Sequence, residues 1–138
     1  MLKSKILFAW AVFGVLLGAT QAAEAPAGTD WSKAQTIGIS LSDFSFAPAH
    51  LQLHANQPYR LHLTNSSSHG HDFDAPVLFA SAGIAPDDQS KVVDGSIEVG
   101  SGQSIDVKFV PNAAGTYKFH CSHFLHSAFG MTGEAVVQ

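Results

Sequence analysis

Apolar and polar residues alternate along most of the chain after residue 35, and this period of two constrains the fold more than any other feature. The alternating segments are 37–41, 51–53, 59–63, 97–99, 105–109, 117–121 and 135–137. A period of two places successive side chains on opposite faces of a strand, so that one face is buried and the other is solvated. Turn residues such as Gly100-Ser101-Gly102 separate the runs. The sequence therefore predicts seven or eight short strands in an all-β, antiparallel Greek-key β-sandwich.

One stretch, residues 75–92, departs from the alternation. It predicts a short helical or irregular insertion, with a helix around 77–82 that Gly83 would end.

The N-terminus has the layout of a secretory signal peptide. Lys3 and Lys5 precede an apolar run at 6–18, and small residues follow at 19–22. The run is shorter than the roughly 20 residues that a membrane-spanning helix needs. We therefore expect a cleaved leader rather than a retained membrane anchor.

Cleavage after Ala22 would leave a flexible lead-in at 23–35 and a single domain at 36–138. That domain would be exported, and periplasmic if the source is a Gram-negative bacterium, with no membrane association once the leader is gone. The part after residue 22 keeps five of seven basic residues and all eleven acidic ones, a formal net charge of −6. An acidic domain without basic clusters is a poor ligand for nucleic acid. We expect a monomer that does not bind nucleic acid.

The chain has one cysteine, Cys121, so an intramolecular disulfide is excluded. Metal ligation would explain a lone thiol in an exported protein. His126 follows Cys121 by five residues, and Met131, the only methionine after the initiator, follows His126 by five. A thiolate and two imidazoles in a trigonal set, with a weak thioether bond, form the blue-copper environment. The spacing therefore indicates a copper site that lacks one imidazole.

His71 is the best candidate for that second imidazole. It lies just past the strand predicted to end near Thr64, where we expect a loop beside Cys121. His69, two residues away, is the alternative.

These motifs resemble those of the cupredoxins, the blue-copper family that includes plastocyanin and azurin. The similarity covers most of residues 36–138. It rests on Phe44, Phe46 and Pro48, on the approach Gly115-Thr116-Tyr117-x-Phe119-x-Cys121, on the Cys-x4-His-x4-Met loop, and on the final strand at 133–137.

The resemblance implies one type 1 copper ion with His71, Cys121, His126 and Met131 as its ligands. It implies a protein that shuttles single electrons between redox partners, such as a cytochrome or a copper oxidase or reductase. It also implies a main-chain N–H of Asp72 directed at the cysteine sulfur, with Asn65 pinning the loop.

An enzymatic copper centre is not expected. Multicopper oxidases, whose type 1 loop is similar, have histidine on both sides of the cysteine, and Ser122 stands on one side here. Copper nitrite reductases share a His-Cys pair like His120-Cys121, but Pro76 occupies the place of a further histidine in their pattern.

Two other functions stay open at this point. A copper carrier that supplies an exported oxidase would need a labile, exposed site, often rich in methionine. A zinc-binding structural domain would use Cys121 with His71, His123 and His126 in a tetrahedron. Visible colour would separate copper from zinc.

The remaining candidates have ordinary structural interpretations. His69, His120 and His123 are expected to be surface residues, and whether any of them binds a second metal is left open. Four apolar residues surround His126, and they could form either a docking rim or part of the core: Phe124, Leu125, Ala128 and Phe129.

Overall fold

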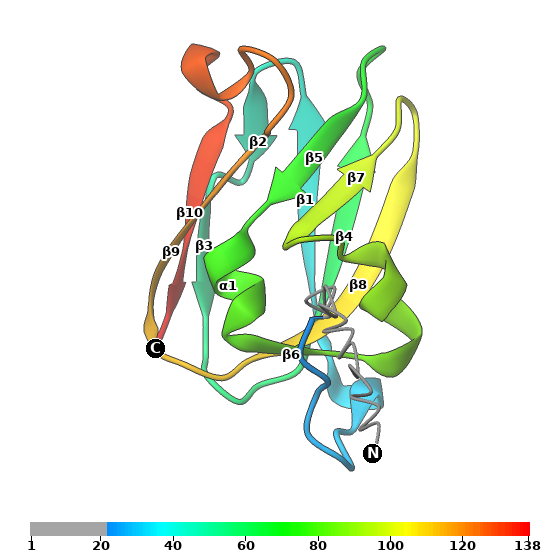
Figure 1. Cartoon of the computed structure of the whole chain (residues 1–138), viewed down its shortest axis with the longest axis vertical. Helices are drawn as coiled ribbons and strands as arrows, with labels where there is room; N and C mark the ends of the chain where they lie inside the picture. The colour runs from blue at the N-terminus through cyan, green and yellow to red at the C-terminus, as the bar shows by residue number, and fades with distance from the viewer. Residues whose placement is uncertain (1–21) are drawn as a thin grey trace, which may run out of the picture.

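The computed structural model describes residues 22–138, so the predicted leader lies outside the described residues except for Ala22. Two five-stranded sheets make up the domain (Figure 1). The first has the order β2-β1-β4-β8-β6 and contains β1 (Gln35–Ser42), β2 (Ser45–Ala47), β4 (Tyr59–Asn65), β6 (Ala82–Ile84) and β8 (Ser104–Pro111). The second has the order β3-β10-β9-β5-β7 and contains β3 (His50–Leu53), β5 (His71–Asp74), β7 (Ser96–Val99), β9 (Gly115–His120) and β10 (Thr132–Val137).

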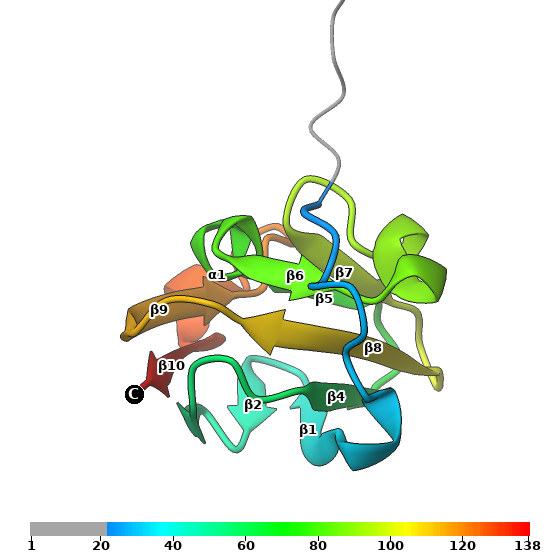
Figure 2. The same cartoon turned by 90° about the horizontal axis from the view of Figure 1, so that it is seen from below.

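The sandwich is confirmed, but two strand pairs run in parallel where the prediction has antiparallel strands. Seen from below, β1 and β4 lie on one side of the molecule and β5 and β7 on the other (Figure 2). Most strand pairs are antiparallel, but β1 pairs with β4 in parallel and so does β3 with β10. The alternation within one strand shows which face is buried and carries no information about the direction of its neighbour.

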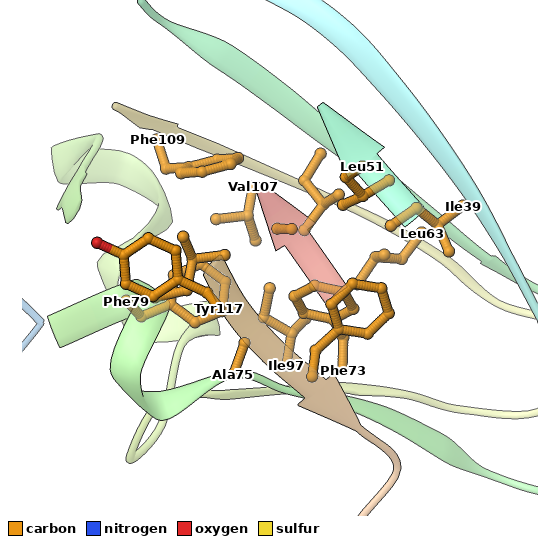
Figure 3. Close-up of a cluster of buried hydrophobic side chains, with 14 of the residues drawn as sticks. Ile39, Leu51, Leu63, Phe73, Ala75, Phe79, Ile97, Val107, Phe109 and Tyr117 are labelled. Atoms are coloured by element: carbon orange, nitrogen blue, oxygen red, sulfur yellow. The ribbon is translucent and has the colours of Figure 1, made fainter. Parts of the chain in front are cut away.

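Alternating apolar side chains from both sheets fill the space between them (Figure 3). Phe73 of β5 lies at the centre, with its ring centroid 4.6 Å from that of Phe119 and 6.0 Å from that of Phe46. All three rings are at least 96% buried. Each such side chain contributes about 1.5–3 kcal/mol through burial. The packed rings hold β5, which begins at His71, and β9, which ends directly before Cys121.

The insertion at 75–92 is confirmed, but the helix is displaced from its predicted place. Helix α1 spans Pro76–Ala80, and the 3₁₀ helix η2 spans Pro86–Lys91. The prediction that Gly83 ends the helix is wrong, because Ser81 caps it. Gly83 belongs to β6, where an added Cβ would lie 2.5 Å from the Cα of Ala25. None of the helices within residues 22–138 is long and apolar enough to cross a membrane.

The lead-in predicted to be flexible is instead held against the domain. Residues 23–25 form a short parallel extension of the first sheet, in which Ile84 N–H donates to Ala23 O (2.8 Å) and Ala25 N–H donates to Ile84 O (3.0 Å). The 3₁₀ helix η1 (Trp31–Lys33) follows, and the Asp30 carboxylate caps it by accepting from Ser32 N–H (3.1 Å). The extension covers the main-chain groups of an edge strand.

Candidate metal centre

The predicted ligands meet at one end of the sandwich, the upper end in Figure 1. His71 is the first residue of β5, and Asp74 of the same strand pairs with His120, the last residue of β9. Cys121 follows directly. His71 lies in a strand rather than in the predicted loop: it pairs with Val99 of β7, and its Nδ1 lies 3.8 Å from Cys121 Sγ.

The segment 121–131 then returns to β10 as a closed loop. The N–H of Cys121 donates to Met131 O (3.1 Å), and the N–H of Met131 donates to His126 O (3.0 Å). The 3₁₀ helix η3 (Ser127–Phe129) lies within this loop, and Gly130 ends it with a left-handed φ of 99°. Because the loop is closed by its own main chain, a spacing of five residues suffices to bring Cys121, His126 and Met131 together.

Three donor atoms face a common point. Cys121 Sγ lies 3.8 Å from His71 Nδ1 and 3.3 Å from His126 Nδ1, and the two imidazole nitrogens are 3.1 Å apart. A point equidistant from these three atoms lies about 2.0 Å from each, which is close to the usual length of a bond between a transition metal and histidine nitrogen. The residues present therefore fit a trigonal thiolate-bis(imidazole) set of the type 1 kind. Met131 is fully buried, and its main chain is hydrogen-bonded to the main chains of both Cys121 and His126.

The hydrogen bonds around His71 fix which of its nitrogens carries the proton. Nε2 lies 2.9 Å from Ser67 Oγ and 3.3 Å from Asp43 Oδ1. The Ser67 hydroxyl donates its own proton to Asn65 Oδ1 (2.8 Å) or His69 O (3.0 Å), and an ionised carboxylate can only accept. These acceptors favour the tautomer with the proton of His71 on Nε2, which leaves Nδ1 with a lone pair for a metal.

Electrostatics also favour the neutral form of His71. Burial and then the neighbouring His126 lower the pKa of its imidazole, outweighing Asp43, which raises it. A neutral imidazole is the form that binds a metal.

Cys121 is fully buried, and this burial raises the pKa of its thiol to about 11. The main-chain N–H groups of Asp72 and His123 act in the opposite direction and lower this pKa. A hydrogen bond from the Asp72 N–H to the sulfur stays a prediction. A bound cation displaces the proton from a coordinating thiol, so the site is poised to exchange a proton for a soft metal.

Asn65 pins the loop before His71, as predicted. It is 99% buried, and its Nδ2 donates to His69 O (2.7 Å) and to Val99 O (2.9 Å). Its Oδ1 accepts from Ser67 N–H (3.0 Å) and from Ser67 Oγ (2.8 Å). Since Ser67 Oγ accepts from His71, Asn65 supports a predicted ligand through one intermediate.

The buried carboxylate of Asp72 joins three segments around the centre. Oδ1 accepts from Ser122 N–H (2.6 Å), while Oδ2 accepts from the Ser122 hydroxyl and from Ser96 Oγ (2.9 Å). Burial by itself raises the pKa of Asp72, but these hydrogen bonds outweigh it and hold the pKa below its usual value. The carboxylate thereby fixes the residue that follows Cys121.

The other histidines near the centre have carboxylate partners. His69 Nδ1 lies 3.3 Å from Asp43 Oδ1, and His120 Nε2 lies 3.2 Å from Asp74 Oδ2. His123 directs Nε2 to Glu98 (3.0 Å). The zinc hypothesis required His123 to share an ion with Cys121, and the described cluster around Cys121 instead consists of His71, Cys121 and His126.

An apolar surface surrounds His126. Phe124 is 88% exposed and Phe129 is 64% exposed, with Leu125 about half exposed. The exposure of these side chains favours the interpretation as a docking rim over the interpretation as part of the core. The imidazole of His126 is only partly buried.

The sequence did not indicate that Phe44 belongs to this rim. Its ring lies 5.4 Å from those of His126 and Phe129. Asp43 and Ser67 were also missed as partners of His71. A polar residue four positions before a candidate ligand was the only local sign of Ser67, and Asp43 and Phe44 come from the distant turn between β1 and β2.

Comparisons with known proteins bear on the family and the fold. The sequence matches the model of the cupredoxin-like domain over residues 6–137. No curated protein matched the sequence. Auracyanin B is a structural neighbour with a TM-score of 0.59 and 22% identity, covering 88% of this chain and 96% of the other. The dithionite-reduced auracyanin of the photosynthetic bacterium Roseiflexus castenholzii gives a TM-score of 0.57 and 20% identity, with 76% and 98% covered.

A multicopper oxidase is also similar in structure, with a TM-score of 0.55 and 18% identity. The match covers 75% of this chain and only 41% of the oxidase, so it concerns one part of that larger protein. At these identities the neighbours show the fold, and the family follows from the sequence match over nearly the whole chain. The chain belongs to the cupredoxin-like family.

Proposed function

We propose that this protein is an exported single-electron carrier with one type 1 copper ion. His71, Cys121 and His126 would hold the ion in a trigonal set, with Met131 as the weak fourth ligand. The convergence of their donor atoms, 3.1–3.8 Å apart in a buried site, is the observation that carries the proposal. When bound, copper supplies a one-electron change between Cu(I) and Cu(II).

The role of the protein is to keep the ligands still during that change. His71 is held from behind by Ser67 and Asp43, and Asp72 fixes the main chain after Cys121. Ligands that are fixed before the electron arrives need little rearrangement. A neutral His71 and a cysteine shielded from water provide soft ligands that would accommodate both Cu(I) and Cu(II).

Electrons would pass through His126. Its Nδ1 faces the donor cluster, while its ring packs nearly perpendicular to that of Phe44 in the exposed apolar rim. The rim excludes water without burying enough area for a long-lived complex, as expected of redox encounters below about 1,200 Å². The net charge of −6 after residue 22 would attract a basic partner, such as a cytochrome, and make the association rate fall with salt.

A copper carrier is the weaker alternative, because delivery requires an accessible ion. Here His71, Cys121 and Met131 are each fully buried. The absence of catalysis is likewise part of the proposal, since Ser122 hydrogen-bonds Asp72 in the place where oxidases have a second histidine.

The test compares electron exchange in rim variants of the copper-loaded protein. Phe124→Asp and Phe129→Asp should slow exchange with a soluble basic cytochrome while leaving the copper spectrum unchanged. Val77→Asp is the matched control, because Val77 is 66% exposed and belongs to α1, outside the rim. Exchange rates equal to the wild type in both rim variants would contradict docking at His126, and rapid loss of copper to a Cu(I) chelator would favour the carrier.

A further inference from the structure

A histidine and two carboxylates form a second cluster next to the proposed copper site, without sharing any of its donor atoms. Asp72 comes from β5, Glu98 from β7 and His123 from the loop after β9, and one ligand atom of each lies within 4.8 Å of the others. We propose that these three side chains bind one divalent transition-metal ion of the Zn²⁺ type at the protein surface.

The pair of His123 and Glu98 already has the separation that a shared ion requires. His123 Nε2 lies 3.0 Å from Glu98 Oε1 and 3.1 Å from Oε2. With an ion about 2.1 Å from both the nitrogen and one oxygen, the N–metal–O angle would be roughly 90°, within the range of octahedral or five-coordinate sites. Two ligand atoms of one such ion are at most about 4.2 Å apart, which is their separation when they lie on opposite sides of the ion. The side chain of Glu98 is 61% exposed, so its carboxylate can move toward a shared ion.

Asp72 has one acceptor position left. An ionised carboxylate offers about four lone-pair sites, and three accept from Ser122 N–H, the Ser122 hydroxyl and Ser96 Oγ. These bonds leave Oδ1 with a single partner and hold the group rigidly. A rigid oxygen with a free lone pair is a ready-made ligand.

Gly70 keeps the space beside the cluster open. A Cβ added there would come within 3.3 Å of Glu98 Oε1 and 3.4 Å of His123 Cε1. A side chain at this position would therefore crowd two of the proposed ligands.

The charges in the cluster favour a bound cation, because the ion pair of His123 with Glu98 leaves the second carboxylate without a positive partner among the described residues. Two carboxylates face one imidazole, and the lysine ion pairs found within residues 22–138 go elsewhere, to Asp30 and Asp88. A divalent ion would balance the excess negative charge. Imidazole with carboxylates suits Zn²⁺ and other first-row ions, whereas Ca²⁺ and Mg²⁺ prefer oxygen alone.

Zinc binding to the copper-loaded protein tests the proposal, because copper then fills the site of Cys121. After dialysis against ZnCl₂, the wild type should retain one zinc in addition to its copper. Glu98→Gln and His123→Ala should bind zinc at least tenfold more weakly and keep their copper. His50→Ala is the matched control, because His50 pairs with Glu134 (3.3 Å) but belongs to neither of the clusters around the ligand loop; its zinc binding should equal that of the wild type.

Thermal unfolding provides a second readout. Zinc would join the ligand loop to β5 and β7, so it should raise the Tm of the wild type and leave that of Glu98→Gln unchanged. The proposal is overturned if the wild type keeps no zinc, or if Glu98→Gln binds zinc as tightly as the wild type.

The proposal does not depend on the copper proposal, and a further variant separates the two. Cys121→Ser removes the thiolate of the copper site and should keep a zinc site that is sensitive to Glu98→Gln. Zinc that disappears with Cys121→Ser and persists in Glu98→Gln would belong to the Cys121 site, and the second site would be wrong whatever the outcome for copper.

Discussion

Replacement of Asn65 by alanine should destabilise the fold and weaken the metal centre together. The change removes the side-chain amide that hydrogen-bonds three main-chain groups: Val99 O, His69 O and Ser67 N–H. The bond to Val99 is buried, and leaving such a group unpaired costs about 1–3 kcal/mol; the other two are partly exposed and cost about 0.5–1 kcal/mol each. We expect a loss of about 3 kcal/mol, or roughly 12 °C in Tm for a domain of this size.

The assay is urea unfolding of the metal-free protein, followed by competition for Cu(I) with a chelator. Because Ser67 loses its support and Ser67 orients His71, copper affinity should fall by about 10–100-fold. Asn112→Ala is the control, since Asn112 is exposed and should cost less than about 0.5 kcal/mol. A loss below about 1 kcal/mol for Asn65→Ala, or one equal to the control, would refute this account of the loop.

Three further outcomes follow from the hydrogen bonds and the pKa shifts. Ser67→Ala removes the nearer of the two acceptors for His71 Nε2–H and should weaken copper binding by about tenfold at nearly unchanged stability; unchanged affinity in a chelator competition would contradict the proposed orientation of the ring. The thiol of metal-free Cys121, buried and with its pKa raised to about 11, should react slowly with thiol reagents at pH 7 and faster up to pH 11, and rapid reaction at pH 7 would contradict it. Asp72 has a lowered pKa in the folded protein, so its contribution to stability is complete above about pH 4, the ordinary value. This contribution is lost as the pH falls through the lower folded value, and Asp72→Asn should remove it from the pH dependence of urea unfolding, whereas the exposed Asp87→Asn should not.

Local spacing was sufficient to predict part of the site. Cys121, His126 and Met131 belong to one loop that its own main chain closes, so five-residue intervals translate directly into proximity. The alternation of apolar residues likewise predicted the longer strands. Strand β5, with only four residues that are nearly all buried, shows no alternation and was missed as a strand.

The interactions that were missed join distant parts of the chain. Asp43 and Phe44 approach His71 and His126 only because β1 and β2 end beside the ligand loop. The parallel pairing of residues 23–25 with Ile84 depends on the space that Gly83 leaves. Neither relation has a local pattern, because the first is set by the packing of one sheet against the other and the second by pairing along a sheet edge.

The central claim is that Cys121 binds copper as a thiolate in a trigonal site. The most direct test is the visible absorption spectrum of the copper-loaded protein, measured with its copper content and compared with Cys121→Ser. The account predicts one copper per chain and an intense thiolate-to-Cu(II) band in the wild type, with the band absent from the variant. A band that persists in Cys121→Ser, or a wild type that binds copper without it, would contradict the account.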